Sequence, residues 1–129
     1  MDKRAVGKRF EEKACEYMAE QGFLVLERNF RCRQGEIDVI GEDGEYLVFA
    51  EVKYRASGMS GNPAEAVTAA KQKKICRTAD YYRYRHGIGE DRAVRYDVIA
   101  IEAAKGNGTG KQEESPQIIW YKNAFFHIR

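Results

Sequence analysis

The segment EYLVFAEVKYR, residues 45–55, combines the apolar run of a buried β-strand with charges that such a strand seldom contains. The residues from Tyr46 to Ala50 are typical of a central strand of a sheet. Glu51 and Lys53 follow before the run has ended, although acidic and basic side chains are rarely buried unless they are paired or have a functional role. The end of this strand is therefore a candidate functional site, and the fold decides what lies beside it.

The chain has the size and composition of one globular domain. Its 129 residues, 43% of them hydrophobic, suffice for a single core. We expect one domain over residues 1–129, with a loop at about 103–115, where the sequence shows no periodicity. The sequence has neither an apolar run long enough for a membrane span nor an N-terminal secretory signal. These features predict a cytoplasmic protein with no membrane partner, in which the three cysteines stay reduced.

The spacing of hydrophobic residues predicts the order of helices and strands. Helical periodicity covers residues 3–20 and 64–84, and strand patterns cover 23–30, 36–40, 46–53, 95–101 and, at the periphery, 117–121. The third strand, the second helix and the fourth strand form a crossover unit, which should be right-handed and join parallel strands. The predicted fold class is α/β, a mixed sheet flanked by helices with the order helix, three antiparallel strands, helix, strand.

A tight turn between the second and third strands would bring acidic residues together. The Asp-Gly pair at 43–44 is a strong hairpin signal. A turn centred there places Glu36 opposite Glu51 and makes Asp38 a diagonal neighbour of Glu51, with backbones about 7–8 Å apart. Since side chains alternate along a strand, Asp38, Glu51 and Lys53 emerge on one face.

Two carboxylates and a lysine in this arrangement suit metal-assisted hydrolysis. Unpaired, the carboxylates of Asp38 and Glu51 would repel each other and be costly to desolvate. Mg²⁺, or Mn²⁺ in its place, would remove that cost, because it prefers oxygen ligands and keeps several waters. Lys53 would then orient the attacking water or offset charge on a phosphate. The alternative is a salt bridge of Lys53 with Glu51 or Asp38 at the rim of the sheet.

The same residues resemble a known nuclease signature. Asp38 followed at hairpin distance by Glu51-Val52-Lys53 resembles the D…(D/E)xK pattern of the restriction-endonuclease-like superfamily. The segments GKRFEEKACEYM, NFRCRQGEIDVI, LVFAEVKYR, GNPAEAV and RYDVIAI resemble, in order and spacing, the YraN-like family (uncharacterised protein family 0102). The resemblance covers nearly the whole chain apart from 103–115. It implies a restriction-endonuclease-like fold similar to that of archaeal Holliday-junction resolvases.

The resemblance also implies roles for individual residues. Asp38 and Glu51 match the acidic metal ligands, the backbone carbonyl of Val52 would complete the ligand set, and Lys53 matches the catalytic lysine. Glu11 matches the glutamate of the first helix, and helical geometry places it beside the apolar stripe, where it can point into the site. A surface role in solubility is the alternative for Glu11.

For several other residues the sequence allows a functional and a structural interpretation. Glu36 is an extra ligand or, as we favour, an exposed or salt-bridged neighbour. The tyrosines at 81, 82 and 84 could stack on unpaired bases, but packing is favoured because Tyr82 continues the apolar stripe of its helix. Asp97 is most simply a residue at the rim of a strand. Basic side chains either bind phosphates or form a solvated surface, and the candidates are Arg31, Arg33, Arg55, Lys71, Lys74 and Arg77.

These features lead to two hypotheses from different classes. The first is a metal-dependent endonuclease that hydrolyses phosphodiester bonds in DNA, including branched, Holliday-junction-like DNA. The second is a non-catalytic nucleic-acid-binding protein that keeps the nuclease fold. A net charge of +2 does not by itself indicate a nucleic-acid partner. The sequence leaves open DNA or RNA and the form of the substrate. It also leaves open a homodimer, which would give a junction-cutting enzyme its two active sites.

Overall fold

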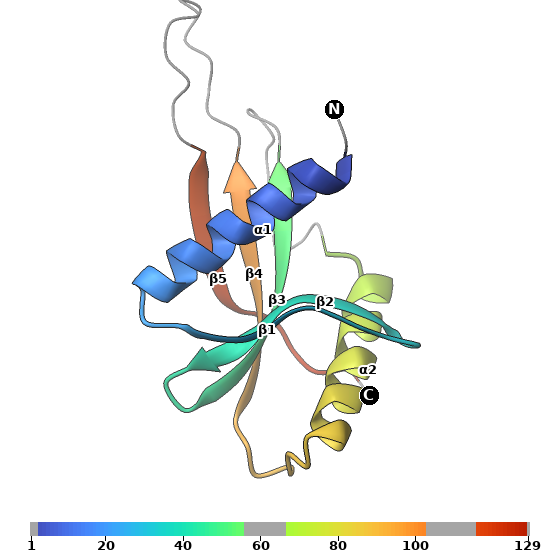
Figure 1. Ribbon diagram of the computed structural model, residues 1–129. Coiled ribbons are helices and arrows are strands. Elements are labelled where there is room, and N and C mark those ends of the chain that lie inside the picture. The colour runs from blue at the N-terminus through green and yellow to red at the C-terminus, as the bar shows by residue number, and fades with distance from the viewer. Residues whose placement is uncertain (1–2, 56–66, 103–115, 129) are drawn as a thin grey trace, which may run out of the picture.

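The computed structural model of the chain describes residues 3–55, 67–102 and 116–128. The predicted loop at about 103–115 and the predicted helix start at Ala64 lie outside these residues. No helix in the described part of the chain is long and apolar enough to cross a membrane. The elements, shown in Figure 1, are α1 (Lys3–Glu20), β1 (Leu24–Cys32), β2 (Gly35–Asp43), β3 (Tyr46–Arg55), α2 (Ala69–Arg85), β4 (Val94–Glu102) and β5 (Gln117–Phe125).

The five strands form one mixed sheet in the order β1-β2-β3-β4-β5. β3 and β4 are parallel, and every other neighbouring pair is antiparallel. The predicted α/β class and the parallel crossover through α2 are confirmed. β3 lies in the centre of the sheet, which explains why its sequence is the most continuous apolar run of the chain. The predicted peripheral strand is confirmed as β5, which closes the sheet at the β4 edge.

The two helices cover opposite faces of this sheet (Figure 1). α1 buries Ala14 and Met18 against side chains that include Val48 and Ile99. Because successive side chains of a strand point to opposite faces, the alternate residues of the same strands serve the second face.

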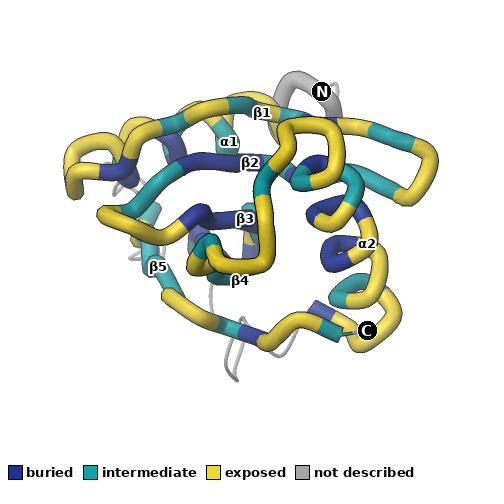
Figure 2. The backbone as a smooth tube through the Cα atoms, turned by 90° about the horizontal axis from the view of Figure 1, so that it is seen from below, coloured by how far each residue is buried: buried dark blue, intermediate teal, exposed yellow. Residues whose placement is uncertain are grey.

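On that second face α2 buries Ile75, Ala79 and Tyr82 against a cluster that includes Phe49 and Val98. Figure 2 shows the inward side of α2 buried and its outward side exposed. The predicted apolar stripe of this helix is therefore confirmed. The central strands are therefore packed between two apolar layers, which hold in place the backbone that carries the polar side chains of β2 and β3.

The turn between β2 and β3 differs from the predicted turn by one residue. It consists of Gly44 and Glu45, with Asp43 paired to Tyr46. Gly44 has a φ of 59°, a conformation that glycine adopts without the clash of a side chain. The predicted register was therefore wrong by two residues, because a turn at Asp43 and Gly44 sets a different pairing. An even shift keeps every side chain on its face, so the shared-face argument is unaffected.

Helix α2 begins at Ala69, five residues later than the predicted start. Thr68 is its N-cap, and the Thr68 hydroxyl accepts a 3.1 Å hydrogen bond from the backbone N–H of Lys71. Val67 and Thr68 are not helical. The cap satisfies one of the free N–H groups of the first turn. It also places Lys71 in that first turn, close to the end of β3.

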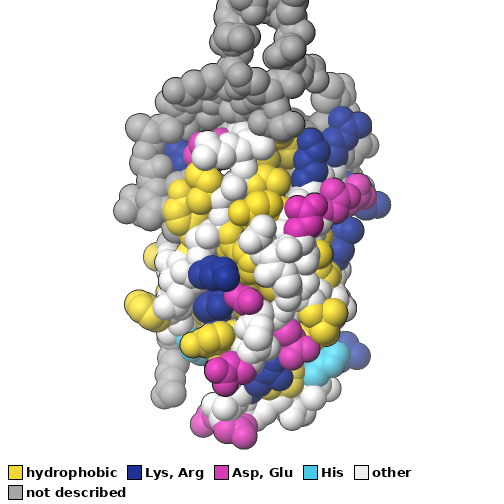
Figure 3. Space-filling view, turned by 90° about the vertical axis from the view of Figure 1, so that its left-hand side faces the viewer, with side chains coloured by type: hydrophobic (Ala, Val, Ile, Leu, Met, Phe, Trp, Pro, Cys, Tyr) yellow, Lys and Arg dark blue, Asp and Glu magenta, His cyan; other side chains and the backbone are white. Residues whose placement is uncertain are grey.

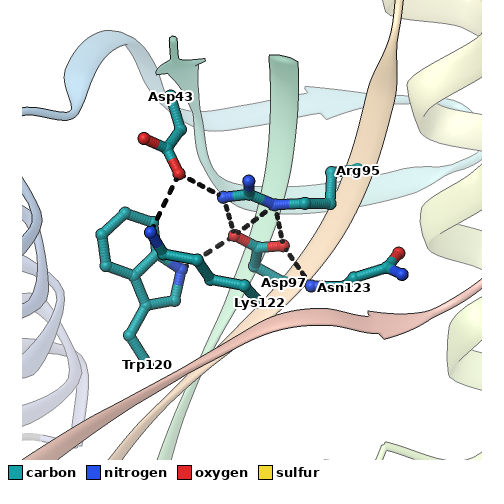
Figure 4. A network of polar contacts seen from close by, with 6 residues as sticks. All are labelled: Asp43, Arg95, Asp97, Trp120, Lys122 and Asn123. Carbon is teal, nitrogen blue, oxygen red and sulfur yellow. Dashed lines mark hydrogen bonds and ion pairs between the residues drawn. The ribbon is translucent and has the colours of Figure 1, made fainter.

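Asp97 is not a strand-rim residue, and that interpretation was wrong. Its side chain is fully buried and accepts hydrogen bonds from the guanidinium of Arg95, from the indole N–H of Trp120 at 2.8 Å and from the backbone N–H of Asn123 at 2.8 Å (Figure 4). Asn123 has a φ of 57° and lies where the pairing of β4 with β5 is irregular. Asp97 therefore fixes the bulge of the edge strand, a structural role.

Candidate active site

Asp38 and Glu51 come together where the backbone pairing of β2 and β3 ends. The ladder stops at Val39 and Ala50. One residue further along, the Asp38 carboxylate accepts a 2.8 Å hydrogen bond from the backbone N–H of Val52. The side chain thus takes the place of the next ladder bond and lies directly beside Glu51, rather than diagonally as the predicted register had it. Glu51 is buried, with 7% of its surface exposed.

Burial and like charge both act on this carboxylate pair. Burial, followed by the charge of Glu51, raises the pKa of Asp38 from 3.8 to about 7, and the hydrogen bond from Val52 offsets only part of this. Burial also raises the pKa of Glu51, opposed by the charges of Lys71 and Lys53 and by a hydrogen bond with Asp38. Without a bound cation the pair therefore tends to hold a proton near neutral pH.

Two more carboxylates lie within electrostatic range. Glu11 of α1 and Glu36 of β2 each raise the pKa of Asp38. Glu11 is half-buried whereas Glu12 is exposed, as expected if Glu11 lies at the helix edge that faces the sheet. Glu36 forms a 3.3 Å salt bridge with Arg31. The salt-bridged role that we favoured for Glu36 is confirmed.

Two lysines flank the pair from different elements. The ammonium nitrogen of Lys71, in the first turn of α2, lies 3.8 Å from a carboxylate oxygen of Glu51. Lys53 is two residues beyond Glu51 on β3, and its charge lowers the pKa of Glu51. Lys71 was predicted to bind nucleic acid, and the structure places its ammonium in contact with Glu51. The threonine cap at position 68 is the sequence signal that could have indicated this.

The remaining basic residues are distributed unevenly. Arg55 is only 8% exposed and its guanidinium lies 3.7 Å from Glu102, because β3 continues to Arg55 and pairs there with the end of β4. Arg55 therefore lies within the sheet beside Glu102, and its binding of nucleic acid stays a prediction. Three others are exposed: Arg33, Lys74 and Arg77.

The β1–β2 turn packs closely against α2, which brings exposed basic residues of both segments near each other. A Cβ atom added at Gly35 would lie 3.1 Å from the hydroxyl of Thr78 and 3.7 Å from the Cβ of Lys74. Gly35 also has a φ of 152°, so the close approach depends on glycine. Arg33, two residues before Gly35, therefore shares this end of the molecule with Lys74.

The donor set is compatible with magnesium and does not form a complete protein cage. Within residues 3–55, 67–102 and 116–128 no group of three His, Cys, Asp or Glu side chains is arranged to hold a metal ion. Mg²⁺ usually keeps several waters and binds proteins through one or two carboxylates. Asp38 and Glu51 supply two. Because the N–H and C=O of one strand residue point to the same side, the Val52 carbonyl also faces β2.

Fold and site together define an α/β domain with two carboxylates, one buried and one partly buried, and flanking lysines where its second and central strands stop pairing. The chain belongs to the family described as Uncharacterised protein family UPF0102, whose sequence profile matches residues 10–101. This confirms the family that the motifs indicated. The matched range includes Glu11, Asp38, Glu51 and Lys53.

Relatives in several bacteria match most of the chain. A UPF0102 protein of Lachnoclostridium phytofermentans is 44% identical over 101 residues, 78% of this chain and 86% of the relative. One from Nitrosococcus oceani is 38% identical over 122 residues, 95% of this chain and 92% of the relative. One from Marinobacter nauticus is 41% identical over 121 residues, 94% and 92% respectively.

Proposed function

We propose that this protein is a metal-dependent endonuclease that hydrolyses phosphodiester bonds in DNA. The observation that carries the proposal is the placement of Asp38 beside Glu51 where the pairing of β2 and β3 ends. Burial raises the pKa of both carboxylates, and the charge of Glu51 raises the pKa of Asp38 further. Titratable groups perturbed in this way concentrate at functional sites. The likeness of the motif to the restriction-endonuclease-like superfamily supports the same reaction.

Each residue of the site has a distinct task in this reaction. Asp38 and Glu51 would hold Mg²⁺ or Mn²⁺, with the Val52 carbonyl as a third oxygen. A bound divalent ion supplies charge neutralisation at the phosphate and a lower pKa for a water molecule. The Lys53 ammonium, which carries positive charge and is no metal ligand, orients the attacking water or stabilises charge that develops on the phosphate. Glu11 of α1, whose charge raises the pKa of Asp38, would accept a hydrogen bond from water at the site.

Exposed basic residues near the site would hold the substrate backbone. Lys74 and Arg77 lie on α2 beyond Lys71, and Arg33 lies at the adjacent β1–β2 turn. Contacts of such side chains with phosphates are independent of sequence and depend strongly on salt. On the face seen in Figure 3, on the β5 side of the molecule, acidic and basic side chains of the coloured residues are mixed. The substrate is therefore assigned to the α2 side.

A second candidate is a non-catalytic nucleic-acid-binding protein with the same fold. The observation in its favour is the 3.8 Å contact of Lys71 with Glu51, through which a cation of the chain itself already compensates one carboxylate. In that case the acidic cluster is structural, and divalent ions are not needed.

A cleavage assay separates the two candidates. End-labelled single-stranded DNA, duplex DNA, a four-way junction and single-stranded RNA are incubated with the protein in Mg²⁺, Mn²⁺ or EDTA. The nuclease predicts cleavage that requires the metal and is lost in Asp38→Asn and Glu51→Gln. Glu45→Gln, in the exposed turn at the far end of the same hairpin, should cleave normally. Binding without cleavage on every substrate would establish the second candidate. Sedimentation of the protein on the junction tests whether two copies assemble there.

A further inference from the structure

A groove between α2 and the β1–β2 turn is lined by aromatic and polar side chains, of which only Arg77 has a role above. It has a volume of about 330 Å³ and is lined by Gln34, Arg77, Asp80, Tyr81 and Tyr84. Tyr84 is 84% exposed and Tyr81 is half-buried. Most large aromatic side chains of a small domain contribute to its core, so an exposed tyrosine beside a groove is available to a ligand.

The three tyrosines of α2 divide into two kinds. Tyr82 is buried and packs edge-on against Phe30 and Phe49, so the favoured packing role is confirmed for this residue. Tyr81 is supported on one side by Phe30, at 6.3 Å between ring centroids. The guanidinium carbon of Arg85 lies 6.0 Å from the Tyr81 ring. Tyr81 is thus held in place by the protein and remains only partly covered.

A row of side chains along α2 leads from the groove toward the candidate active site. Residues three and four apart are neighbours on a helix surface, and this spacing joins Lys71, Lys74, Arg77, Tyr81 and Tyr84. At 1.5 Å per residue the row is about 20 Å long, the length of several nucleotides. Its first member touches Glu51.

The charges along the row suit a polynucleotide. Lys74 and Arg77 are exposed near its middle, and Arg85 is exposed at its far end. The one acidic side chain among the groove residues, Asp80, is hydrogen-bonded to His127 at 2.8 Å. Gln34 supplies an amide that can donate and accept hydrogen bonds at a base edge.

We propose that this groove binds unpaired bases by stacking on Tyr81 and Tyr84, while Lys74 and Arg77 hold the phosphates that lead toward the carboxylate pair. The ligand is a single-stranded polynucleotide or the splayed strand of a branched one. A duplex cannot use the groove in this way, because its bases are already stacked inside the helix. The inference rests on the proposed function in one respect. The proposed nuclease site is the reason for expecting the bound polynucleotide to run from the groove toward the carboxylate pair.

Binding in EDTA tests the groove without reference to cleavage. Fluorescence anisotropy is measured with labelled single strands of twelve thymidines or twelve uridines and with a mixed-sequence duplex of the same length. The double variant Tyr81→Leu/Tyr84→Ala should bind both single strands about tenfold or more weakly and the duplex within about twofold of the wild type. A preference between the two single strands identifies the sugar that the groove favours.

Matched variants distinguish stacking from other effects of the substitutions. Tyr81→Phe/Tyr84→Phe keeps the aromatic faces and should retain single-strand affinity. Tyr46→Ala removes a tyrosine that is 41% exposed, at the start of β3, and should leave affinity unchanged. Thermal melting confirms that each variant is folded. Lys74→Ala/Arg77→Ala should weaken the binding of every nucleic acid. It should also reduce the slope of log affinity against log salt concentration by about two.

The outcomes separate the groove from the nuclease. The base-stacking groove is contradicted if Tyr81→Leu/Tyr84→Ala keeps its affinity for single strands, or if it loses affinity for single strands and duplex equally. Either result would contradict the groove even if the protein cleaves DNA. A selective loss of affinity for single strands supports the base-stacking groove even if no substrate is cleaved. In that case only the proposed nuclease activity is contradicted.

Discussion

The Asp38 carboxylate accepts a 2.8 Å hydrogen bond from the backbone N–H of Val52, across the gap where β2 and β3 stop pairing. This contact fixes the carboxylate at the side of Glu51, on the next strand. One backbone donor does not offset burial and a neighbouring carboxylate, since the pKa of Asp38 remains raised to about 7. The site therefore holds negative groups close together at a cost that a cation would relieve.

That cost predicts a specific dependence of stability on pH in metal-free buffer. Between about pH 4 and pH 7 folded Asp38 holds a proton that the unfolded chain releases, so the free energy of unfolding falls as pH rises through this window. Asp38→Asn stays neutral and keeps an oxygen for the Val52 N–H. At about pH 8 the variant should be more stable than the wild type by about 2–4 kcal/mol, with the difference vanishing near pH 4.

The measurement is urea unfolding with EDTA across that pH range. Asp43→Asn is the matched control, in which the change in stability at neutral pH should have the opposite sign. Hydrogen bonding with Arg95 lowers the pKa of Asp43, so its contribution is present at neutral pH and is lost as pH falls through the lowered pKa. Asp43→Asn should therefore be less stable than the wild type at neutral pH. Parallel stability curves for Asp38→Asn and the wild type would show that the carboxylate pair is not under strain.

Lys71 should compete with a metal ion for Glu51. Its ammonium lies 3.8 Å from the Glu51 carboxylate, and removing a nearby positive charge strengthens the attraction of the site for a cation. Lys71→Met should raise affinity for Mn²⁺ by a few fold while lowering affinity for nucleic acid. Lys73→Met, at an exposed position of the same helix, is the control. Weaker Mn²⁺ binding in Lys71→Met would mean that the lysine supports the metal site rather than opposing it.

Lys53 should be needed for cleavage and not for binding of metal or DNA. A positive charge beside the ion acts on the transition state, so Lys53→Ala should bind Mg²⁺ and DNA nearly normally while cleaving slower by on the order of a hundredfold or more. Lys53→Arg should rescue poorly, because the planar guanidinium differs in shape and hydration from an ammonium. Single-turnover cleavage beside thermal melting is the test. Altered stability with undiminished turnover would favour the salt-bridge role.

Asp97 should govern folding and not activity. It is buried and receives hydrogen bonds from Arg95, Trp120 and Asn123. Asp97→Asn removes the charge that pairs with Arg95 and should cost about 3–5 kcal/mol, measured by urea unfolding. Arg92→Ala, in a more exposed pair with Glu42, should cost less than about 1 kcal/mol. If folded Asp97→Asn protein lost cleavage while stability was unchanged, Asp97 would belong to the site.

The sequence predicted the arrangement of the carboxylates better than their exact register. Face alternation requires only a period of two, so a two-residue error in register does not alter the prediction that Asp38, Glu51 and Lys53 share a face. The error arose because Gly44, which takes the positive φ, is the first turn residue and not the second. Local sequence did not distinguish those two turns.

Long-range pairing was less accessible to sequence reasoning. The contact between Lys71 and Glu51 depends on where α2 begins, and helix boundaries are set by caps such as Thr68 as much as by periodicity. Asp97 looked like a rim residue because its partners from β5 are 23 and 26 residues away. An isolated acid in an apolar strand was the signal, and it indicated burial without naming the partner.

Isothermal titration calorimetry of Mg²⁺ and Mn²⁺ into metal-free protein tests most directly whether Asp38 and Glu51 form a metal site. The wild type and Glu45→Gln should bind with equal affinity. Asp38→Asn and Glu51→Gln should each bind at least about tenfold more weakly, with melting curves that show both to be folded. Wild-type affinity in both variants, or the absence of binding by the wild type itself, would contradict the metal site and with it the proposed reaction.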